Sequence, residues 1–378
     1  MEWQGNGQSI YDRYKRLGIK LRTRDGIAPH QFDQDGWDAL REEGLWELIC
    51  PEGRKADNSC WWQFTAALDG LSSAIGSSGL LLSIIAQAGI VRGLDRWGSD
   101  AQREKYLEAV RTGKLSATGI AEPTTGTDVR DVHTLLTPFG NGYKLNGSKF
   151  NIAHAPVADF FLIVCKQETG AVSLVFLDRG TPGLVTGNYD LKLGNKNLPT
   201  GPIALDDVYV SPEQILGNVD RGLRQLIDIV TLGRVYYGLV ASNLLRPFLT
   251  SAIEYAETRV SFGSPIIEHQ HIQRRLTDII TRIERSRWTA LGALGRLFSE
   301  HPQSLLDCSI AKVVGADDVI SNGLELMKLY GSLGYHIGPV SSVLQDALGF
   351  ASVGGTEEMH RKNIMNQILR LKKKTTND

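Results

Sequence analysis

The chain has 378 residues, of which 42% are hydrophobic and 22% are charged, as in an ordinary globular protein. Lys and Arg total 41 against 42 acidic residues, so no net positive field draws the protein to nucleic acid or to an anionic membrane. The length exceeds what one simple core requires and favours two or three packed units.

The cysteines and the apolar segments indicate the cellular compartment. Cys50, Cys60, Cys165 and Cys308 form neither CxxC pairs nor the framework of a small secreted domain. The N-terminus lacks a charged head followed by an apolar core, and no stretch approaches eighteen uncharged apolar residues. We therefore expect a cytoplasmic protein with reduced thiols, no membrane insertion and no metal site.

Helical spacing of apolar residues dominates from Asp33 to Thr112. Two stripes carry this pattern, namely Trp37, Leu40, Leu45 and Leu48, and then Phe64, Leu68, Leu71 and Ile75. The run 80–90 is apolar nearly all round, which is typical of a helix buried among others. Ser99 and Asp100 predict the start of a further helix. Residues 1–115 are therefore predicted to form an N-terminal helical domain.

Strand-like segments separated by turn residues follow from 116 to 222. A turn is predicted at Asn146-Gly147, and a pair of strands at 160–165 and 172–177 is joined by a turn at 168–170. Further β-rich runs are 184–186, 203–205 and 208–210. Short strands at this spacing predict a middle domain that is a small β-sandwich or barrel.

The helical period returns in the last part of the chain, residues 223–378. Amphipathic patterns cover residues 223–259, 272–298, 305–329 and 357–371. Several are longer than the mean helix of about 11 or 12 residues, which favours a four-helix bundle. The predicted fold class is α+β, mainly α.

A loop motif stands at the entrance to the β domain. Residues 119–128 read G-I-A-E-P-T-T-G-T-D and resemble the flavin loop T-E-P-x-A-G-S-D of the acyl-CoA dehydrogenase superfamily. Backbone N–H groups and a hydroxyl in such a loop can donate to the acceptors of an isoalloxazine ring. The resemblance implies that Ala121, Gly126 and Thr127 contact FAD. An ordinary surface turn is the alternative, and the position of the loop disfavours it.

Three later segments carry the same resemblance. Residues 259–270, R-V-S-F-G-S-P-I-I-E-H-Q, closely resemble the family's R-x-x-F-G-x-x-I-x-x-x-Q, whose side chains reach FAD partly across a subunit interface. This implies a homodimer or homotetramer. Residues 328–335 resemble the adenosine-side turn Q-x-x-G-G-x-G-Y, and residues from 356 match the final G-T-x-x segment. The implied FAD contacts are Arg259, Phe262, Gln270, Lys328, Leu329, Gly331, Thr356 and Glu358.

The resemblance fails at both positions where the family keeps its catalytic carboxylate. Gly354 stands at the common position of the glutamate that removes the α-proton of an acyl thioester. A second lineage, similar to isovaleryl-CoA dehydrogenase, places its glutamate immediately before the family's arginine, and here Gly233 precedes Arg234. The catalytic residue is therefore unknown from the sequence.

The flavin-side segment also departs from the family. The family's W-I-T is represented by Asn151, Ile152 and Ala153, so the indole that covers the ring and the hydroxyl that approaches flavin N5 are missing. Ala121 likewise replaces the threonine of T-E-P. We still expect these residues to contact FAD, with a changed flavin potential, substrate shape or oxygen access.

The residues expected to line the substrate pocket are Arg234, Tyr237, Val353 and Gly354. Arg234 could position a substrate carboxylate, either Tyr236 or Tyr237 could orient a hydroxyl, and His154 could exchange protons near neutral pH. The structural alternatives are a helix-face ion pair, an aromatic core stripe and a solvent-exposed imidazole.

The resemblance implies FAD-dependent oxidation of an acyl thioester, either acyl-CoA or an acyl group on an acyl or peptidyl carrier protein. Because both carboxylates are missing, we expect chemistry such as oxidation toward a hydroxymalonyl- or aminomalonyl-type unit. Two alternatives stay open at this point. One is a flavin-dependent monooxygenase of the same fold, and the other is a non-catalytic flavin-binding protein that acts through interaction.

Overall fold

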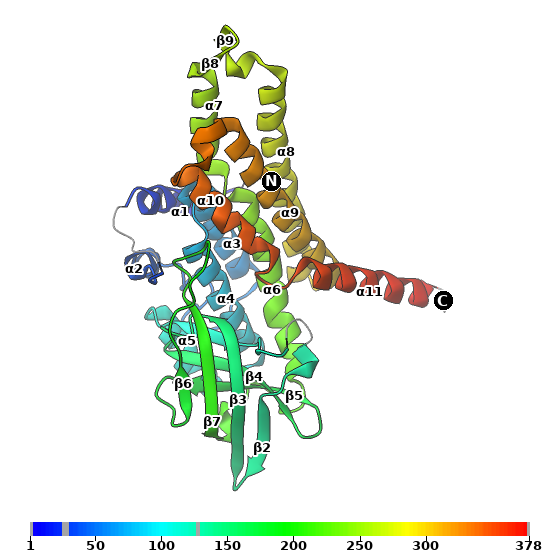
Figure 1. Ribbon diagram of the computed structural model, residues 1–378. Coiled ribbons are helices and arrows are strands. Elements are labelled where there is room, and N and C mark those ends of the chain that lie inside the picture. The colour runs from blue at the N-terminus through cyan, green and yellow to red at the C-terminus, as the bar shows by residue number, and fades with distance from the viewer. Residues whose placement is uncertain (1–2, 25–29, 126–128, 376–378) are drawn as a thin grey trace.

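The computed structural model describes residues 3–24, 30–125 and 129–375, which form three parts in chain order (Figure 1). The first is helical, with α1 (Asn6–Arg22), α2 (Gln34–Glu42), α3 (Asn58–Ile75), α4 (Gly79–Trp97) and α5 (Asp100–Arg111). The second contains β1 (Ser116–Gly119), β2 (Leu135–Phe139), β3 (Gly142–Ala153), β4 (Phe160–Gln167), β5 (Val172–Asp178), β6 (Leu184–Thr186) and β7 (Thr200–Val210).

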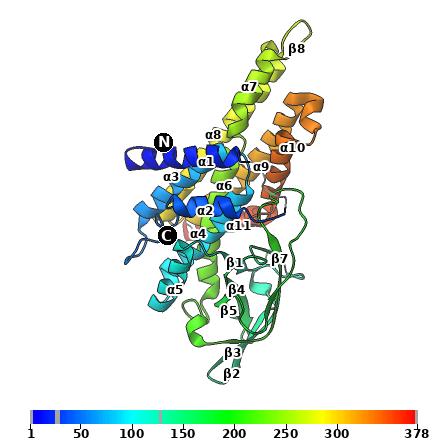
Figure 2. The same cartoon turned by 90° about the vertical axis from the view of Figure 1, so that its left-hand side faces the viewer.

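The third part contains α6 (Gly222–Asn243), α7 (Leu249–Thr258), α8 (Gln270–Phe298), α9 (Ser304–Tyr330), α10 (Pro339–Leu348) and α11 (Glu357–Thr375). The short strands β8 (Val260–Ser261) and β9 (Ser264–Pro265) join α7 to α8. Two views show the β domain at one end and the α7–α8 hairpin at the other (Figures 1 and 2). The predicted α+β, mainly α class is confirmed.

The N-terminal helices follow local signals, with one exception. The predicted helix start at Ser99 is confirmed, because Ser99 and Gln102 form a reciprocal capping box. No helix was expected before Asp33, yet α1 lies there and buries Tyr14 and Leu17 against α3. A Cβ on Gly70 of α3 would meet the backbone of Tyr11, so this close approach requires glycine.

The middle domain is one seven-stranded sheet in the order β1-β4-β2-β3-β7-β6, with β5 paired to β4. Its interior is apolar and includes Leu136, Phe161, Ile163, Val175 and Leu177. The turn predicted at Asn146-Gly147 is wrong, because β3 runs through it, and the two predicted strands after 203 are one strand, β7. Asn146 Oδ1 accepts a hydrogen bond from the Asp207 amide at 2.7 Å. This bond joins β3 to β7 where their pairing register shifts, so both strands continue through the shift.

The C-terminal helices form a bundle in which α6, α8 and α9 pack together. The long pattern at 223–259 is two helices, because a 3-10 turn at Arg246–Phe248 contains Pro247, which cannot continue an α-helix. The helix α10 was not predicted. A Cβ on Gly238 of α6 would lie 2.6 Å from the Ala311 carbonyl oxygen, so glycine allows α6 to cross α9 closely. None of the helices in the described ranges is long and apolar enough to cross a bilayer.

Candidate functional site

The turn before α11 places Gly354 directly against Tyr237 of α6. Gly354 has φ +74°, a conformation that favours glycine. A Cβ there would lie 2.6 Å from Tyr237 Cε2, and closer still to Cδ2, so the phenol ring fills the space of any side chain at position 354. A carboxylate is thus absent from this position and also sterically excluded.

The second family position for the base lies one helical turn before Tyr237. A Cβ on Gly233 would lie 3.5 Å from Tyr237 Cε2 and 3.8 Å from Ile85 Cγ2, which are ordinary van der Waals distances. A side chain could therefore begin here without moving its neighbours. The two missing carboxylates differ physically, because one position is blocked and the other is open.

Arg234 is a guanidinium without an acidic partner. Its Nη2 lies 3.7 Å from Met359 Sδ, and its Nε is buried with no hydrogen-bond partner. No carboxylate in the described chain lies within ion-pair distance, and burial lowers the pKa of Arg234. The ion pair considered as the structural alternative is therefore absent from the described residues.

Two further basic residues contact the segment 350–354, His360 at Gly354 and Lys312 at Phe350. His360 is buried, and its Nε2 donates to the Gly354 carbonyl oxygen at 3.1 Å, while Nδ1 has no partner. Burial, together with the charges of Arg234 and Lys312, lowers the pKa of His360 to about 4. Lys312 is buried and donates to the Phe350 carbonyl oxygen at 2.5 Å, and burial lowers its pKa to about 8. Neither residue was singled out, although a lysine within the apolar run 308–315 was a usable signal.

The start of α11 completes this side of the site. Thr356 Oγ1 accepts a long hydrogen bond from the Met359 amide at 3.5 Å. Val353 is half-buried against the helical core, and Glu358 is exposed. The four residues expected to line the substrate pocket therefore come from α6 and from the turn before α11, and Gly354 contacts Tyr237 directly.

The flavin-side segment lies at the end of β3, opposite the start of β7. Ala153 pairs directly with Thr200, and Ile152 pairs with Gly201. A bulge at Phe150 and Asn151, where Asn151 has φ +53°, leaves both of these side chains exposed. Ile152 points into the sheet core, whereas Ala153 packs toward the helices.

Thr200 carries a buried hydroxyl with no hydrogen-bond partner. Directly opposed residues of antiparallel strands share one face, so this hydroxyl lies beside Ala153, where the family has a threonine. An unpartnered donor and the exposed ring of Phe150 fit the polar edge and flat face of an isoalloxazine. Sequence reasoning missed both residues, because the strand register that places them cannot be read from one sequence.

The flavin loop is anchored by a buried ion pair. Lys149 Nζ donates to Glu122 Oε1 at 2.7 Å, and the backbone amides of His133 and Thr134 donate to the same carboxylate at 2.6 and 2.9 Å. Burial raises the pKa of Glu122, but these hydrogen bonds outweigh it and hold the pKa at about 2. The half-buried Ala121 accepts a hydrogen bond from the Phe150 amide at 2.9 Å. Gly126 and Thr127 lie outside the described residues.

Hydrogen bonds to Asp346 connect the β domain to the helix α10, which precedes the turn that contains Gly354. Asp346 of α10 accepts hydrogen bonds from the Asn195 amide at 2.6 Å and from the Ser78 amide at 3.0 Å. Asn195 lies in the loop that leads into β7 and Thr200. The loop before β7 and the helix α10 that precedes the Gly354 turn are therefore held together through one half-buried carboxylate.

The remaining expected FAD contacts lie at the other end of the bundle. Phe262, at the tip between α7 and α8, is 98% exposed, and Arg259 and Gln270 beside it are also exposed (Figure 1). Lys328 pairs with Glu325 at 2.8 Å, Leu329 is buried, and Gly331 ends α9 with φ +60°.

The length of α9 separates the residues around Gly354 from the expected FAD contacts at the other end of the bundle. Lys312, which borders the Gly354 turn, and Leu329 are 17 residues apart on α9, which is roughly 25 Å at 1.5 Å per residue. The tip and the adenosine-side turn lie at the same end, because Tyr255 of α7 stacks on Tyr330 with ring centroids 4.6 Å apart. One chain therefore does not bring its tip residues to its own Gly354 turn.

His154 is not a surface imidazole. It is fully buried, and its Nδ1 donates to the Ser116 carbonyl oxygen at 2.9 Å. Burial lowers its pKa to about 4, so the predicted proton exchange near neutral pH is wrong.

The buried histidines predict a loss of stability in mild acid. The unfolded imidazole binds a proton near pH 6.5, whereas folded His154 and His360 resist protonation down to about pH 4. The contribution of the histidines to stability should therefore be constant above pH 6.5 and fall toward pH 4, by up to about 1.4 kcal/mol per pH unit for each histidine. Urea unfolding from pH 4.5 to 7.5 checks this. The His154→Asn variant should show a shallower slope, and an unchanged slope would contradict the assignment.

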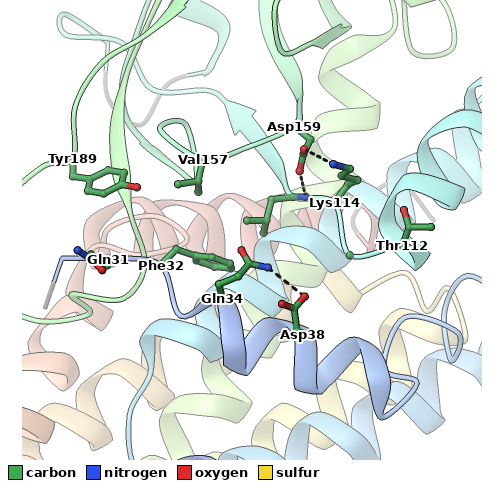
Figure 3. A pocket seen from close by; sticks show the side chains of 11 residues that line it. Gln31, Phe32, Gln34, Asp38, Thr112, Lys114, Val157, Asp159 and Tyr189 are labelled. Carbon is green, nitrogen blue, oxygen red and sulfur yellow. Dashed lines mark hydrogen bonds and ion pairs between the residues drawn. The ribbon is translucent and has the colours of Figure 1, made fainter. Parts of the chain in front are cut away.

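A separate pocket of about 520 Å³ opens between α2, the end of α5 and the β domain (Figure 3). Its charged groups are already paired, since Lys114 Nζ lies 3.1 Å from Asp159 Oδ1 and Gln34 donates to Asp38. It shares no lining residue with those expected to hold FAD or the thioester. Among the described residues there is no cluster of His, Cys, Asp or Glu arranged to hold a metal.

Comparison with known proteins identifies the family. Residues 19–114, 117–208 and 220–369 match the N-terminal, middle and C-terminal domains of acyl-CoA dehydrogenase. The chain is 30% identical over 271 residues to the short-chain specific acyl-CoA dehydrogenase of Megasphaera elsdenii, and the aligned residues make up 70% of each protein. It is 28% identical over 270 residues to the L-prolyl-[peptidyl-carrier protein] dehydrogenase of Serratia sp. (strain ATCC 39006), again 70% of each.

Among solved structures, the prolyl acyl carrier protein oxidase AnaB superposes with a TM-score of 0.91 at 23% identity, over 97% of this chain and 99% of that one. This likeness extends the agreement in fold to nearly the whole length of both proteins. The protein belongs to the acyl-CoA dehydrogenase family and is an FAD-dependent oxidoreductase.

Proposed function

We propose that this oxidoreductase acts on an acyl thioester and oxidises a carbon that bears a hydroxyl group, toward a hydroxymalonyl- or aminomalonyl-type unit. The observation that carries this proposal is the Tyr237 ring in the space of a side chain at Gly354. With Gly233 also lacking a carboxylate, no acidic residue occupies either family position for removing an α-proton.

The chemistry of such a substrate explains why the base is dispensable. Oxidation at a carbinol or an aldehyde hydrate removes a hydride from carbon and a proton from oxygen. An oxygen-bound proton transfers readily to water or a weak base, so a strong base held against a carbon acid is unnecessary. When bound, FAD supplies the two-electron acceptor for the hydride.

The residues of this chain would then bind the flavin and orient the reacting group of the substrate. The expected contacts Ala121, Asn151, Ile152 and Ala153, joined by Phe150 and Thr200, would hold the flavin ring. Tyr237 has no hydrogen-bond partner for its hydroxyl among the described residues and would orient the reacting group. Burial raises the pKa of Tyr237 to about 12, so it would act as a neutral hydrogen-bond donor.

A carrier protein is the proposed form in which the thioester arrives. The support is the similarity to the Serratia L-prolyl-[peptidyl-carrier protein] dehydrogenase. An acyl-CoA thioester presents the same reacting end, so both forms belong in the test. We place the protein in the cytoplasm, where such thioesters are made, and expect no nucleic-acid or membrane partner.

A second subunit would complete the FAD site. The exposed Arg259, Phe262 and Gln270 lie at the far end of their own bundle, beside the segment Lys328, Leu329 and Gly331. We propose that these residues reach the FAD of a partner copy, while Thr356 and Glu358 serve the FAD of their own chain. This arrangement requires at least a homodimer, and a homotetramer pairs two such dimers.

Anaerobic flavin reduction tests the proposed function. The purified holoprotein is mixed with hydroxyacyl, aminoacyl and saturated acyl thioesters, each as the CoA form and loaded on a carrier protein. Bleaching of the oxidised flavin band is expected with a hydroxyacyl thioester, with or without an additional amino group on the acyl chain, and not with butyryl-CoA. Absence of bleaching with every thioester would contradict the proposal.

Two additional measurements separate the alternatives. Oxygen consumption with supplied reduced flavin, and incorporation of labelled oxygen into product, would indicate a monooxygenase. Failure of every substrate to reduce the flavin, combined with a stable stoichiometric protein partner, would indicate a flavin-binding interaction protein.

A further inference from the structure

Arg234 differs from the other partly buried arginines of the helical domains. Arg92 pairs with Asp228 at 3.1 Å, Arg246 with Glu284 at 2.6 Å, and Arg287 with Asp69 at 2.6 Å, in each case with an acidic residue of another element. The guanidinium of Arg234 meets a thioether instead, at Met359 Sδ. Its Nε is also buried without a hydrogen-bond partner in the described chain.

A guanidinium in this state indicates a missing partner. A partly buried charge without a counter-charge is costly, because the protein interior solvates it far less well than water does. Arginine stays protonated at such a site, so the charge cannot be relieved by losing a proton. The planar fork of donors matches the two oxygens of a carboxylate better than it matches any neutral group.

The surroundings add no negative charge that could serve instead. His360 is held neutral by its buried position, and the Lys312 ammonium is occupied by the Phe350 carbonyl oxygen. The carboxylates of Asp317 and Glu357 act on Lys312, and no acidic residue is among the groups that act on Arg234. The thiol of Cys308, which lies within electrostatic range of Arg234, is buried with its pKa raised to about 12 and stays protonated. The titratable groups named here around Arg234 are therefore either positive or neutral.

The position of Arg234 relates this charge to the reacting end of a thioester. Arg234 follows Gly233 and precedes Tyr237 by three residues on α6, so it lies within one turn of both family positions for the base. A carboxylate held here would belong to the acyl group itself and not to a distant part of the carrier.

We infer that Arg234 recognises a carboxylate on the acyl group, which makes the substrate or product a malonyl-type thioester. This inference rests on the proposed function, because it takes an acyl thioester as the ligand. It adds a carboxylate to that ligand and identifies the residue that selects it.

Binding of two matched probes that cannot be oxidised tests the inference. Malonyl-pantetheine carries the carboxylate, and malonamoyl-pantetheine replaces it with a neutral amide of nearly equal size. Dissociation constants are measured on the holoenzyme by calorimetry for the wild type, Arg234→Lys, Arg234→Met and the control Arg296→Met. Arg296 lies on α8 and forms an exposed ion pair with Asp307, so its loss should leave binding unchanged.

The wild type and Arg296→Met should bind the malonyl probe roughly 10- to 100-fold more tightly than the malonamoyl probe. Arg234→Met should bind both probes equally, and Arg234→Lys should keep part of the preference. The inference is overturned if the wild type shows no preference, if Arg234→Met keeps it, or if Arg234→Met loses FAD while remaining folded by its melting curve. Because neither probe is oxidised, this result is independent of the flavin-reduction test.

Discussion

The Gly354→Glu variant is expected to be destabilised and to gain no dehydrogenase activity, although it restores the residue that the family commonly has. The φ of +74° at this position costs a non-glycine residue roughly 1–3 kcal/mol. Overlap between the new Cβ and the Tyr237 ring adds a further overpacking cost of about 1–3 kcal/mol. Urea unfolding should therefore show a marked loss of stability, and butyryl-CoA should not bleach the flavin.

The Gly233→Glu variant is expected to behave in the opposite way. A Cβ there meets only ordinary contacts, and Glu has a higher helix propensity than Gly, so α6 should tolerate the change. The new carboxylate would lie next to Arg234, where the isovaleryl-type lineage has its base. A positioned general base contributes roughly 100-fold or more to proton removal, so butyryl-CoA should now bleach the flavin anaerobically.

Gly233→Gln is the matched control, because it has nearly the same size and helix propensity but cannot accept the α-proton. It should fold like Gly233→Glu and leave the flavin oxidised. Equal bleaching by Gly233→Glu and Gly233→Gln would contradict the role of the carboxylate. An active and stable Gly354→Glu variant would show that the Tyr237 ring does not block that position.

The contrast between these two glycines shows what a single sequence could and could not predict. Both missing carboxylates were identified from motif positions, and so was Arg234. Whether each position could hold a side chain depends on Tyr237, which contacts Gly354 across 117 positions of the chain. Such a contact belongs to tertiary packing and leaves no local pattern.

The helices and strands likewise divide into those that local sequence patterns predict and those that depend on tertiary contacts. The helices α3, α4, α8 and α9 were predicted from apolar spacing, because each buries one continuous face or lies wholly inside, and α5 was predicted from its start signal at Ser99. The turn signal at Asn146-Gly147 failed, because the Asn146 side chain satisfies the backbone of Asp207 on the neighbouring strand. Cross-strand partners of this kind, like the pairing of Ala153 with Thr200, are specified by register and not by adjacent residues.

The largest effect on the flavin loop is expected from Lys149→Met. The substitution leaves the Glu122 carboxylate buried without its counter-charge, and breaking a buried pair in this way costs roughly 3–5 kcal/mol. The backbone amides of His133 and Thr134 would still donate to Glu122, so folding should survive with reduced stability. Because Glu122 and Ala121 belong to the loop expected to hold the flavin, FAD should also bind more weakly. Urea unfolding of the apoprotein and fluorescence titration with FAD measure the two effects separately.

Lys144 provides the matched control on the same strand. It forms an ion pair with Asp207 at 2.5 Å, but this pair is exposed, so Lys144→Met should cost at most about 1 kcal/mol and leave FAD affinity unchanged. Adding Glu122→Gln to Lys149→Met removes the uncompensated charge and should recover part of the stability. If FAD affinity stays low in this double variant, the charged pair itself positions the loop. Equal losses of stability in Lys149→Met and Lys144→Met would instead show that burial gives the Glu122–Lys149 pair no special weight.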